Sequence, residues 1–305
     1  MVAPPAPQAT HNPLVGIAWM VLTGLFFVGV TGGVKYLGDD MPAAQSAFVR
    51  YLLGLVFFLP LVPAMARLRL SRRVWGLLGV RGLLHSLGVA MWFYAMARLP
   101  IAEVTAMNYL TPIYVALGAA LFLGERLRAR RLAAIGAAMI GALIILRPGL
   151  REIEPGHLAM LVTALAFAVS YLIVKRLTDD VAPGMMVAVL SVVVTIFLAP
   201  FAWAVWVPPT AGQVAILFVV AALATAGHYT MTRAIAAAPL AVTQPVTFLQ
   251  LLWAALLGLF AFGEPVDGFV IAGGVLIMAS VSFLSWREAM LRRRPTTPPV
   301  EITRH

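Results

Sequence analysis

Apolar residues in this chain form long unbroken runs, separated by short polar or turn-forming stretches. Each run is close to 20 residues, the length an α-helix needs to cross a hydrocarbon core about 30 Å thick. The runs are continuous and not alternating, so a membrane β-barrel is excluded. The pattern predicts an all-α integral membrane protein with ten transmembrane helices, at 14–36, 43–65, 75–98, 101–123, 131–147, 156–177, 183–206, 212–235, 241–262 and 268–287.

Two of these runs share a pattern. Residues 108–127 read NYLTPIYVALGAALFLGERL, and residues 247–266 read TFLQLLWAALLGLFAFGEPV, 139 positions later. The same offset, without a gap, aligns further pairs: Gly88 with Gly227, Pro100 with Pro239, Gly124 with Gly263, and Glu125 with Glu264. The offset maps the third and fourth spans onto the eighth and ninth, so each half holds five spans. An odd number of crossings turns the second half upside down, and the sequence therefore predicts two inverted five-helix repeats.

Inverted repeats are typical of secondary transporters, whose substrate site lies near the middle of the bilayer between the two halves. We place the first repeat at residues 14–149 and the second at residues 150–287. Outside them, residues 1–13 are Pro-rich and expected to be disordered, and residues 288–305 form a basic tail.

Composition and charge support the membrane interpretation. The chain is 62% hydrophobic and 11% charged, whereas soluble domains carry about 25% charged residues. The net charge of +10 comes from short arginine clusters between the apolar runs, as at 67–73 and 125–131, which suit anionic lipid head groups better than nucleic acid. With the N-terminus inside, 16 lysines and arginines fall on the inner loops and tail, and four on the outer loops. This bias predicts cytoplasmic N- and C-termini.

Signals for catalysis or cofactors are missing from the sequence. There is no cysteine, no Walker loop and no histidine spacing suited to a metal. We therefore expect no cofactor, no metal, no direct use of ATP and no enzymatic activity.

The ten spans, the two five-helix halves and the Gly-Glu ending of the fourth span in each half resemble the EamA family of the drug/metabolite transporter superfamily. The resemblance covers about residues 14–287. Within the family, the chain is most similar to the bacterial amino-acid exporters of the YddG type. The resemblance implies a multi-pass carrier of the bacterial inner membrane, with a central cavity lined by spans one, three, four, six, eight and nine.

Polar and aromatic side chains inside the spans are the candidates for substrate contact, because polar groups are costly in a bilayer. We select ten: His85, Trp92, Asn108, Thr111, Tyr171, His228, Thr232, Gln244, Thr247 and Phe248. The repeat places Asn108 opposite Thr247, and such pairs suit the amino and carboxylate groups of a substrate. Interhelical hydrogen bonds without contact to substrate are an equally good explanation for each hydroxyl or amide.

The two intramembrane histidines could carry a proton or make a structural or substrate contact, and we favour the latter because carboxylates are scarce. Glu103 lies in the first turn of the fourth span, where it complements the helix dipole. We expect Glu264 to cap the next helix. Arg50 is expected to pair with a carbonyl or cap a helix end, with a substrate carboxylate as a secondary alternative.

Pro112 and Pro245 are candidates for gating kinks, because a proline removes a helical hydrogen bond. They are not equivalent in the repeat, which predicts bends at different depths in the two halves.

The sequence thus predicts a monomeric secondary transporter that exports small metabolites, above all neutral or aromatic amino acids, by alternating access. Few buried carboxylates disfavour a pump for cationic drugs, and the lack of paired buried basic residues disfavours sugar phosphates. A carrier of S-adenosylmethionine or of a drug-like compound stays open. An intramembrane enzyme with a histidine base, or a scaffold or channel subunit, would not need the inverted repeat.

Overall fold

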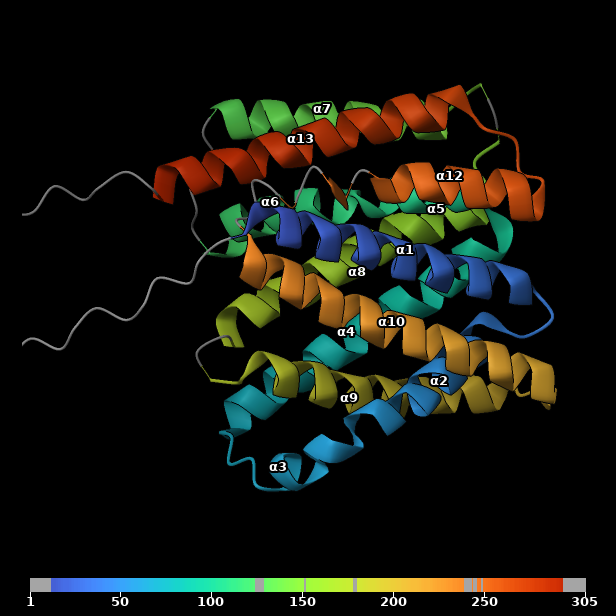
Figure 1. Cartoon of the computed structure of the whole chain (residues 1–305), viewed down its shortest axis with the longest axis vertical. Coiled ribbons are helices and arrows are strands. Elements are labelled where there is room, and N and C mark those ends of the chain that lie inside the picture. Colours follow the sequence, from blue (N-terminus) through green and yellow to red (C-terminus); the bar gives the residue numbers. More distant parts are fainter. Residues whose placement is uncertain are drawn as a thin grey trace, which may run out of the picture.

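The computed structural model describes residues 12–123, 129–150, 152–177, 180–238, 243, 246–247 and 249–292. This part of the chain consists of helices joined by short loops (Figure 1). The helices are α1 (Pro13–Leu37), α2 (Ala43–Gly54), η1 (Leu55–Leu61), α3 (Val62–Ala66), α4 (Arg72–Arg98), α5 (Ile101–Asn108), α6 (Leu110–Leu123), α7 (Ala129–Leu146), α8 (Pro155–Leu177), α9 (Pro183–Ala204), α10 (Ala211–Ala237), α12 (Leu249–Phe262) and α13 (Gly268–Arg292).

Two predicted spans are interrupted. The second continues beyond Gly54 as the 3-10 segment η1, which contains Pro60. The fourth breaks at Tyr109, between α5 and α6. A helical N–H at position 112 would bond to the carbonyl of Asn108, and Pro112 has no N–H to give. The break therefore falls where the missing hydrogen bond leaves the helix weakest.

Within the described residues, eight helical stretches are long and apolar enough to cross a membrane. The apolar parts of α7 and α12, Leu132–Leu146 and Leu249–Phe262, are shorter than this criterion. The all-helical architecture is confirmed, and the number of ten crossings stays a prediction.

The helices run roughly parallel to one another, so that the bundle has two ends (Figure 1). At one, which we call the Asn12 end, the Asn12 N–H donates to the carbonyl of Ala237 over 3.0 Å. At the other, the Lys35 end, Lys35 of α1 lies 3.0 Å from Glu264, which follows α12. Helix α8 begins at the Lys35 end, where His157 contacts Glu103, and runs opposite to α1.

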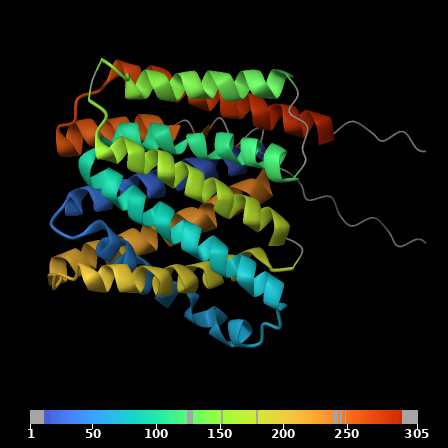
Figure 2. The same cartoon turned by 180° about the vertical axis from the view of Figure 1, so that it is seen from behind.

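Packing between the halves is reciprocal. Helix α1 packs on α10 and α12, and α8 packs on α4 and α6. Helices α7 and α13 lie side by side at one edge, seen from both faces (Figures 1 and 2). A β-carbon on Gly16 would collide with Ala238, and one on Gly156 would collide with Leu99. Each close contact thus occurs twice with the halves exchanged, as a twofold relation between the repeats requires.

The ends of α1, α5 and α12 are tied together by one carboxylate. Glu264 pairs with Lys35, whose ammonium also donates to the carbonyl of Leu99 over 2.7 Å. The second oxygen of Glu264 accepts the Ile101 N–H at 2.8 Å. Glu264 therefore caps α5 in the other half of the protein, and the expectation that it caps the next helix is wrong. Its counterparts Gly124 and Glu125 lie outside the described residues.

Glu103 and His157 form a second link at the Lys35 end, between α5 and α8. Their side chains are 2% and 1% exposed, and His157 Nε2 lies 2.6 Å from the Glu103 carboxylate. The Glu154 N–H donates to His157 Nδ1 at 3.0 Å, so Nε2 carries the proton and donates to Glu103. Glu103 lies in the first turn of its helix as expected, and its partner is a histidine that the sequence did not point to.

Asp267 and Arg147 join the ends of α7 and α13 by an ion pair. Burial by itself would raise the pKa of Asp267. The hydrogen bonds from the Phe269 N–H and the Arg147 guanidinium, together with the Arg147 charge, outweigh it and lower the pKa below the ordinary aspartate value. The carboxylate therefore stays ionised and keeps its partner at neutral pH.

Candidate functional site

Aromatic and basic side chains from five helices meet inside the bundle. They come from α1, α2, α4, α8 and α10, elements of both halves. We call them the central cluster: Phe27, Arg50, Tyr51, Arg81, His85, Phe167, Tyr171 and His228.

Helices α4 and α8 face each other through two rows of side chains in this cluster. Arg81 and His85 are four residues apart on α4, and Phe167 and Tyr171 are four residues apart on α8, so each pair shares a helix face. The His85 ring stacks on Phe167, with 4.8 Å between centroids. The next pair along the rows, Arg81 and Tyr171, interacts electrostatically. Tyr51 of α2 fixes His85 from the side, with 3.2 Å between its hydroxyl and Nε2.

A related arrangement joins α1 and α10. Phe27 contacts His228 edge to face, with 5.2 Å between ring centroids. A β-carbon on Gly227 would lie 3.2 Å from the Phe27 ring, and one on Gly88 would lie 2.7 Å from the Phe167 ring. Each of the two histidine–phenylalanine contacts thus joins the two halves, with a glycine next to the phenylalanine ring.

Two guanidinium groups belong to the cluster. Arg50 lies over the Tyr51 ring, 4.3 Å from its centroid, where the sequence-based expectation was a carbonyl or a helix end. Arg81 is 6% exposed and donates to the Met186 carbonyl over 3.0 Å, while its Nε has no hydrogen-bond partner. Both act electrostatically on His85.

Two members of the cluster are exposed side chains. Tyr171 is 51% exposed, and His228 is exposed as well. Tyr171 and His228 are therefore placed to contact a small molecule.

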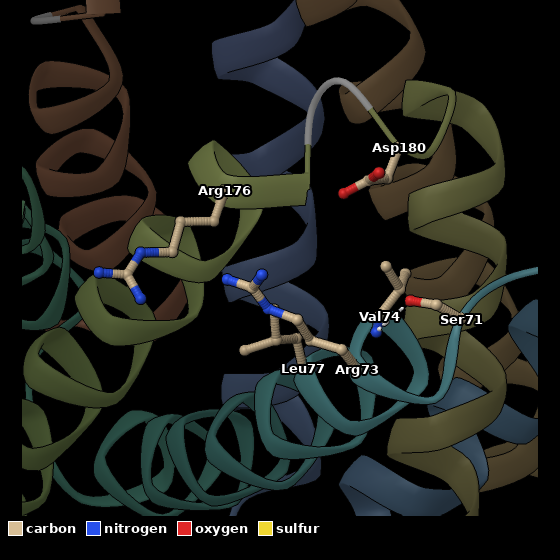
Figure 3. Close-up of a pocket in the computed structure, with 6 residues that line it drawn as sticks. All are labelled: Ser71, Arg73, Val74, Leu77, Arg176 and Asp180. Atoms are coloured by element: carbon tan, nitrogen blue, oxygen red, sulfur yellow. Dashed lines mark hydrogen bonds between the residues drawn. The ribbon is translucent and has the colours of Figure 1, made fainter.

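A separate recess opens at the Asn12 end (Figure 3). It has a volume of about 370 Å³ and is lined by Ser71, Arg73, Val74, Leu77, Arg176 and Asp180. None of these residues belongs to the central cluster. Ser71 caps α4 by accepting the Val74 N–H at 3.3 Å, and the two arginines come from the ends of α4 and α8. This recess is a surface feature between helix ends.

The remaining predicted site residues fall elsewhere. Asn108 and Thr111 flank the α5–α6 break, where Asn108 Oδ1 and Thr111 Oγ1 are buried and have no hydrogen-bond partner among the described residues. Tyr109 donates its hydroxyl to the carbonyl of Thr247 at 3.2 Å. Thr232 donates to the His228 carbonyl on its own helix.

Trp92 is half-buried and packs edge to face on Phe93, with 5.5 Å between centroids. Pro112 is exposed on α6. Gln244, Pro245 and Phe248 lie outside the described residues.

Five members of the cluster were not among the ten predicted site residues: Phe27, Arg50, Tyr51, Arg81 and Phe167. One signal for two of them exists in the sequence. An offset of 140, one more than that of the later spans, aligns Phe27 with Phe167, Thr23 with Thr163, and Lys35 with Lys175. A repeat search that allows one inserted residue between spans would have found both phenylalanines.

Comparison with known proteins gives consistent matches. The model of the EamA-like transporter family matches residues 14–147 and again residues 154–286. A riboflavin transporter of Rhizobium johnstonii is 34% identical, covering 92% of this chain and 94% of the relative. A riboflavin transporter of Vibrio cholerae is 30% identical, covering 93% and 97%. An S-adenosylmethionine uptake transporter of Rickettsia bellii is 25% identical, covering 90% and 94%. These names do not single out amino-acid export, which the resemblance to exporters of the YddG type had implied.

Proposed function

Because the chain belongs to the EamA-like transporter family, and is thus a multi-pass membrane transporter, we propose that it is a secondary carrier for a small metabolite with a planar aromatic ring. Riboflavin is the first candidate. The observation that carries this proposal is the central cluster, in which Phe167, His85, Tyr171 and Phe27 bring rings from both halves together and Tyr171 is exposed. Rings in this position can stack on a flat heterocycle from either side.

Alternating access suits this arrangement. The cluster joins helices of both repeats, and the reciprocal packing lets the halves exchange their contacts. We place the protein in the bacterial inner membrane, with both termini in the cytoplasm, as the arginine distribution predicts. The direction of transport follows the substrate gradient and is left unassigned.

Aromatic amino acids, the substrates predicted from the sequence, are the second candidate, because their rings fit the same contacts. S-adenosylmethionine is less suited, because its sulfonium cation would lie close to Arg50 and Arg81.

The test is uptake of radiolabelled riboflavin, tryptophan and S-adenosylmethionine into liposomes that hold the purified protein. We expect saturable riboflavin uptake, with a KM raised about 2- to 10-fold in Phe167→Leu, in line with about 0.5–1.5 kcal/mol per aromatic pair. Phe201→Leu, an exposed phenylalanine of α9, is the matched control. Elution as a single peak on size exclusion shows that each variant is folded.

Saturable uptake of tryptophan alone would favour the second candidate. Uptake of none of the three, or a Phe167→Leu variant indistinguishable from Phe201→Leu, would overturn the proposal that aromatic stacking in the central cluster selects the substrate.

A further inference from the structure

We propose that the central cluster is an anion site, and that the transported molecule carries a carboxylate or phosphate group bound between Arg50 and Arg81. This inference rests on the proposed function and narrows its substrate class: it places aromatic amino acids and riboflavin 5′-phosphate ahead of uncharged riboflavin. From the sequence, we expected Arg50 to pair with a carbonyl or to cap a helix end, and a substrate carboxylate was the secondary alternative. The proposal ranks an anionic group of the substrate first.

The first argument is an unbalanced charge. A guanidinium is charged at every physiological pH. Taking such a charge out of water costs several kcal/mol unless a partner compensates it. Among the described residues, no carboxylate pairs with Arg50 or Arg81. Within the described part of the chain, the charges of Arg50 and Arg81 thus have no counter-charge, and Arg81 is only 6% exposed.

Three other cations have carboxylate partners. Lys35 pairs with Glu264, Arg98 with Asp39, and Arg147 with Asp267, all at the Lys35 end. Among the described residues, Arg50 and Arg81 have no such partner, although both lie within long apolar helical stretches. A bound anion would remove this imbalance.

The second argument is unused hydrogen-bonding capacity. Arg81 uses one donor for the Met186 carbonyl, and its buried Nε uses none. Arg50 contacts the face of the Tyr51 ring. Planar guanidinium groups match carboxylate and phosphate oxygens with two parallel hydrogen bonds. A guanidinium group with an unused donor is suited to such a ligand.

The third argument is convergence. Arg50 of α2 and Arg81 of α4 both act on His85, which Tyr51 and Phe167 hold in place. His228 of α10 interacts electrostatically with both His85 and Arg50. An anion at this point would touch both halves of the protein, and its ring system would continue along Phe167 and Tyr171. The expected ligand is an aromatic or apolar molecule with one anionic group.

The experiment compares matched pairs of ligands that differ in one anionic group. Riboflavin and riboflavin 5′-phosphate test for phosphate, and 3-phenylpropan-1-ol and 3-phenylpropanoate test for carboxylate. Binding to the purified full-length protein is measured by quenching of tryptophan fluorescence or by thermal shift, and transport is measured in liposomes. We expect the anionic member of at least one pair to bind about tenfold or more tightly than its uncharged partner.

The variants Arg50→Gln and Arg81→Gln are expected to reduce this preference to less than about threefold, a loss of at least one charged hydrogen bond. Arg81→Lys keeps the charge and should retain part of it. Arg98→Gln, on the same helix as Arg81 but exposed and paired with Asp39, should keep the full preference.

Equal binding of the members of both pairs, or a preference that survives both glutamine variants, would overturn the anion site. Saturable transport of uncharged riboflavin without any preference would leave the proposed function standing and refute the anion site alone. A folded protein that neither binds nor transports any of the four ligands would refute both.

Discussion

Single glycines decide where the rings of the central cluster can lie. Gly88 leaves room on α4 for the Phe167 ring, and Gly227 leaves room on α10 for the Phe27 ring. The sequence aligned Gly88 with Gly227 in the repeat, which indicated that the two positions are related. It could not show what the glycines touch, because their neighbours lie on other helices.

Replacing Gly88 with alanine is expected to displace Phe167 and, with it, His85. The added β-carbon would lie 2.7 Å from two ring carbons, and overpacking of this kind costs about 1–3 kcal/mol. We expect a lower melting temperature and a raised KM. Gly79→Ala on the same helix has nothing within 4 Å of the new carbon and is the control. If both variants melted alike, the close Gly88–Phe167 packing would not matter for stability.

The residues that the sequence identified and those it missed differ in kind. His85, Tyr171 and His228 were found because a polar or titratable side chain in an apolar run is conspicuous. Phe27 and Phe167 were missed because phenylalanine is ordinary in such a run. Arg81 was visible, but only the folded bundle shows that it lies near His85, as Arg50 does, and that no carboxylate of the described residues pairs with it.

At the scale of helices, the spans could be predicted from the apolar runs, because a polar or turn-forming stretch ends each run. The first span was predicted at 14–36 and is observed at Pro13–Leu37. The breaks at η1 and Tyr109 were harder to place. A proline in the sequence shows where a helical hydrogen bond is lost, but tertiary packing decides whether the helix bends or breaks there. Which helix end Glu264 caps depends on the arrangement of the halves, which local sequence does not contain.

The Glu264 link is expected to contribute strongly to the stability of the Lys35 end. Glu264→Gln keeps an acceptor for the Ile101 N–H but removes the charge that balances Lys35. We expect it to destabilise the protein by about 1–3 kcal/mol, the range for hydrogen bonds to charged groups. The double variant Lys35→Met/Glu264→Gln should recover part of this loss.

Asp39→Asn is the matched control for this experiment. Asp39 pairs with Arg98 at the same end, but its side chain is 62% exposed, and exposed pairs contribute less than about 1 kcal/mol. Equal melting temperatures for Glu264→Gln and Asp39→Asn would contradict the assigned importance of the Glu264 link.

At the scale of the molecule, the number of crossings can be tested directly, because the chain has no cysteine. We introduce single cysteines at Asp40, Arg69, Glu152 and Asp180, all exposed in loops. An impermeant maleimide should label Asp40→Cys and Glu152→Cys on intact cells, and Arg69→Cys and Asp180→Cys only after permeabilisation. Glu152 follows α7, whose apolar part is short, so labelling of Glu152→Cys from the inside would contradict ten crossings.

The repeat itself was predictable because Pro, Gly and Glu matches at one offset stand out against an apolar background. The contacts that relate the halves, such as Gly16 with Ala238 and Gly156 with Leu99, combine offsets of 140 and 139. A gapless alignment at an offset of 139 therefore matches Leu99 with Ala238 but does not match Gly16 with Gly156.

The depth of Arg50 and Arg81 makes voltage relevant to this protein. Both lie within membrane-spanning helices, and each elementary charge that moves through 100 mV exchanges about 2.3 kcal/mol with the electric field. No carboxylate of the described residues pairs with either guanidinium group, so the proposed site has a charge of two when empty, and a bound monoanion lowers it by one. The free energies of the loaded and the empty protein therefore depend on the membrane potential to different extents. The resting potential of the cell would thus bias one half of the cycle more than the other and act as a driving force alongside the concentration gradient.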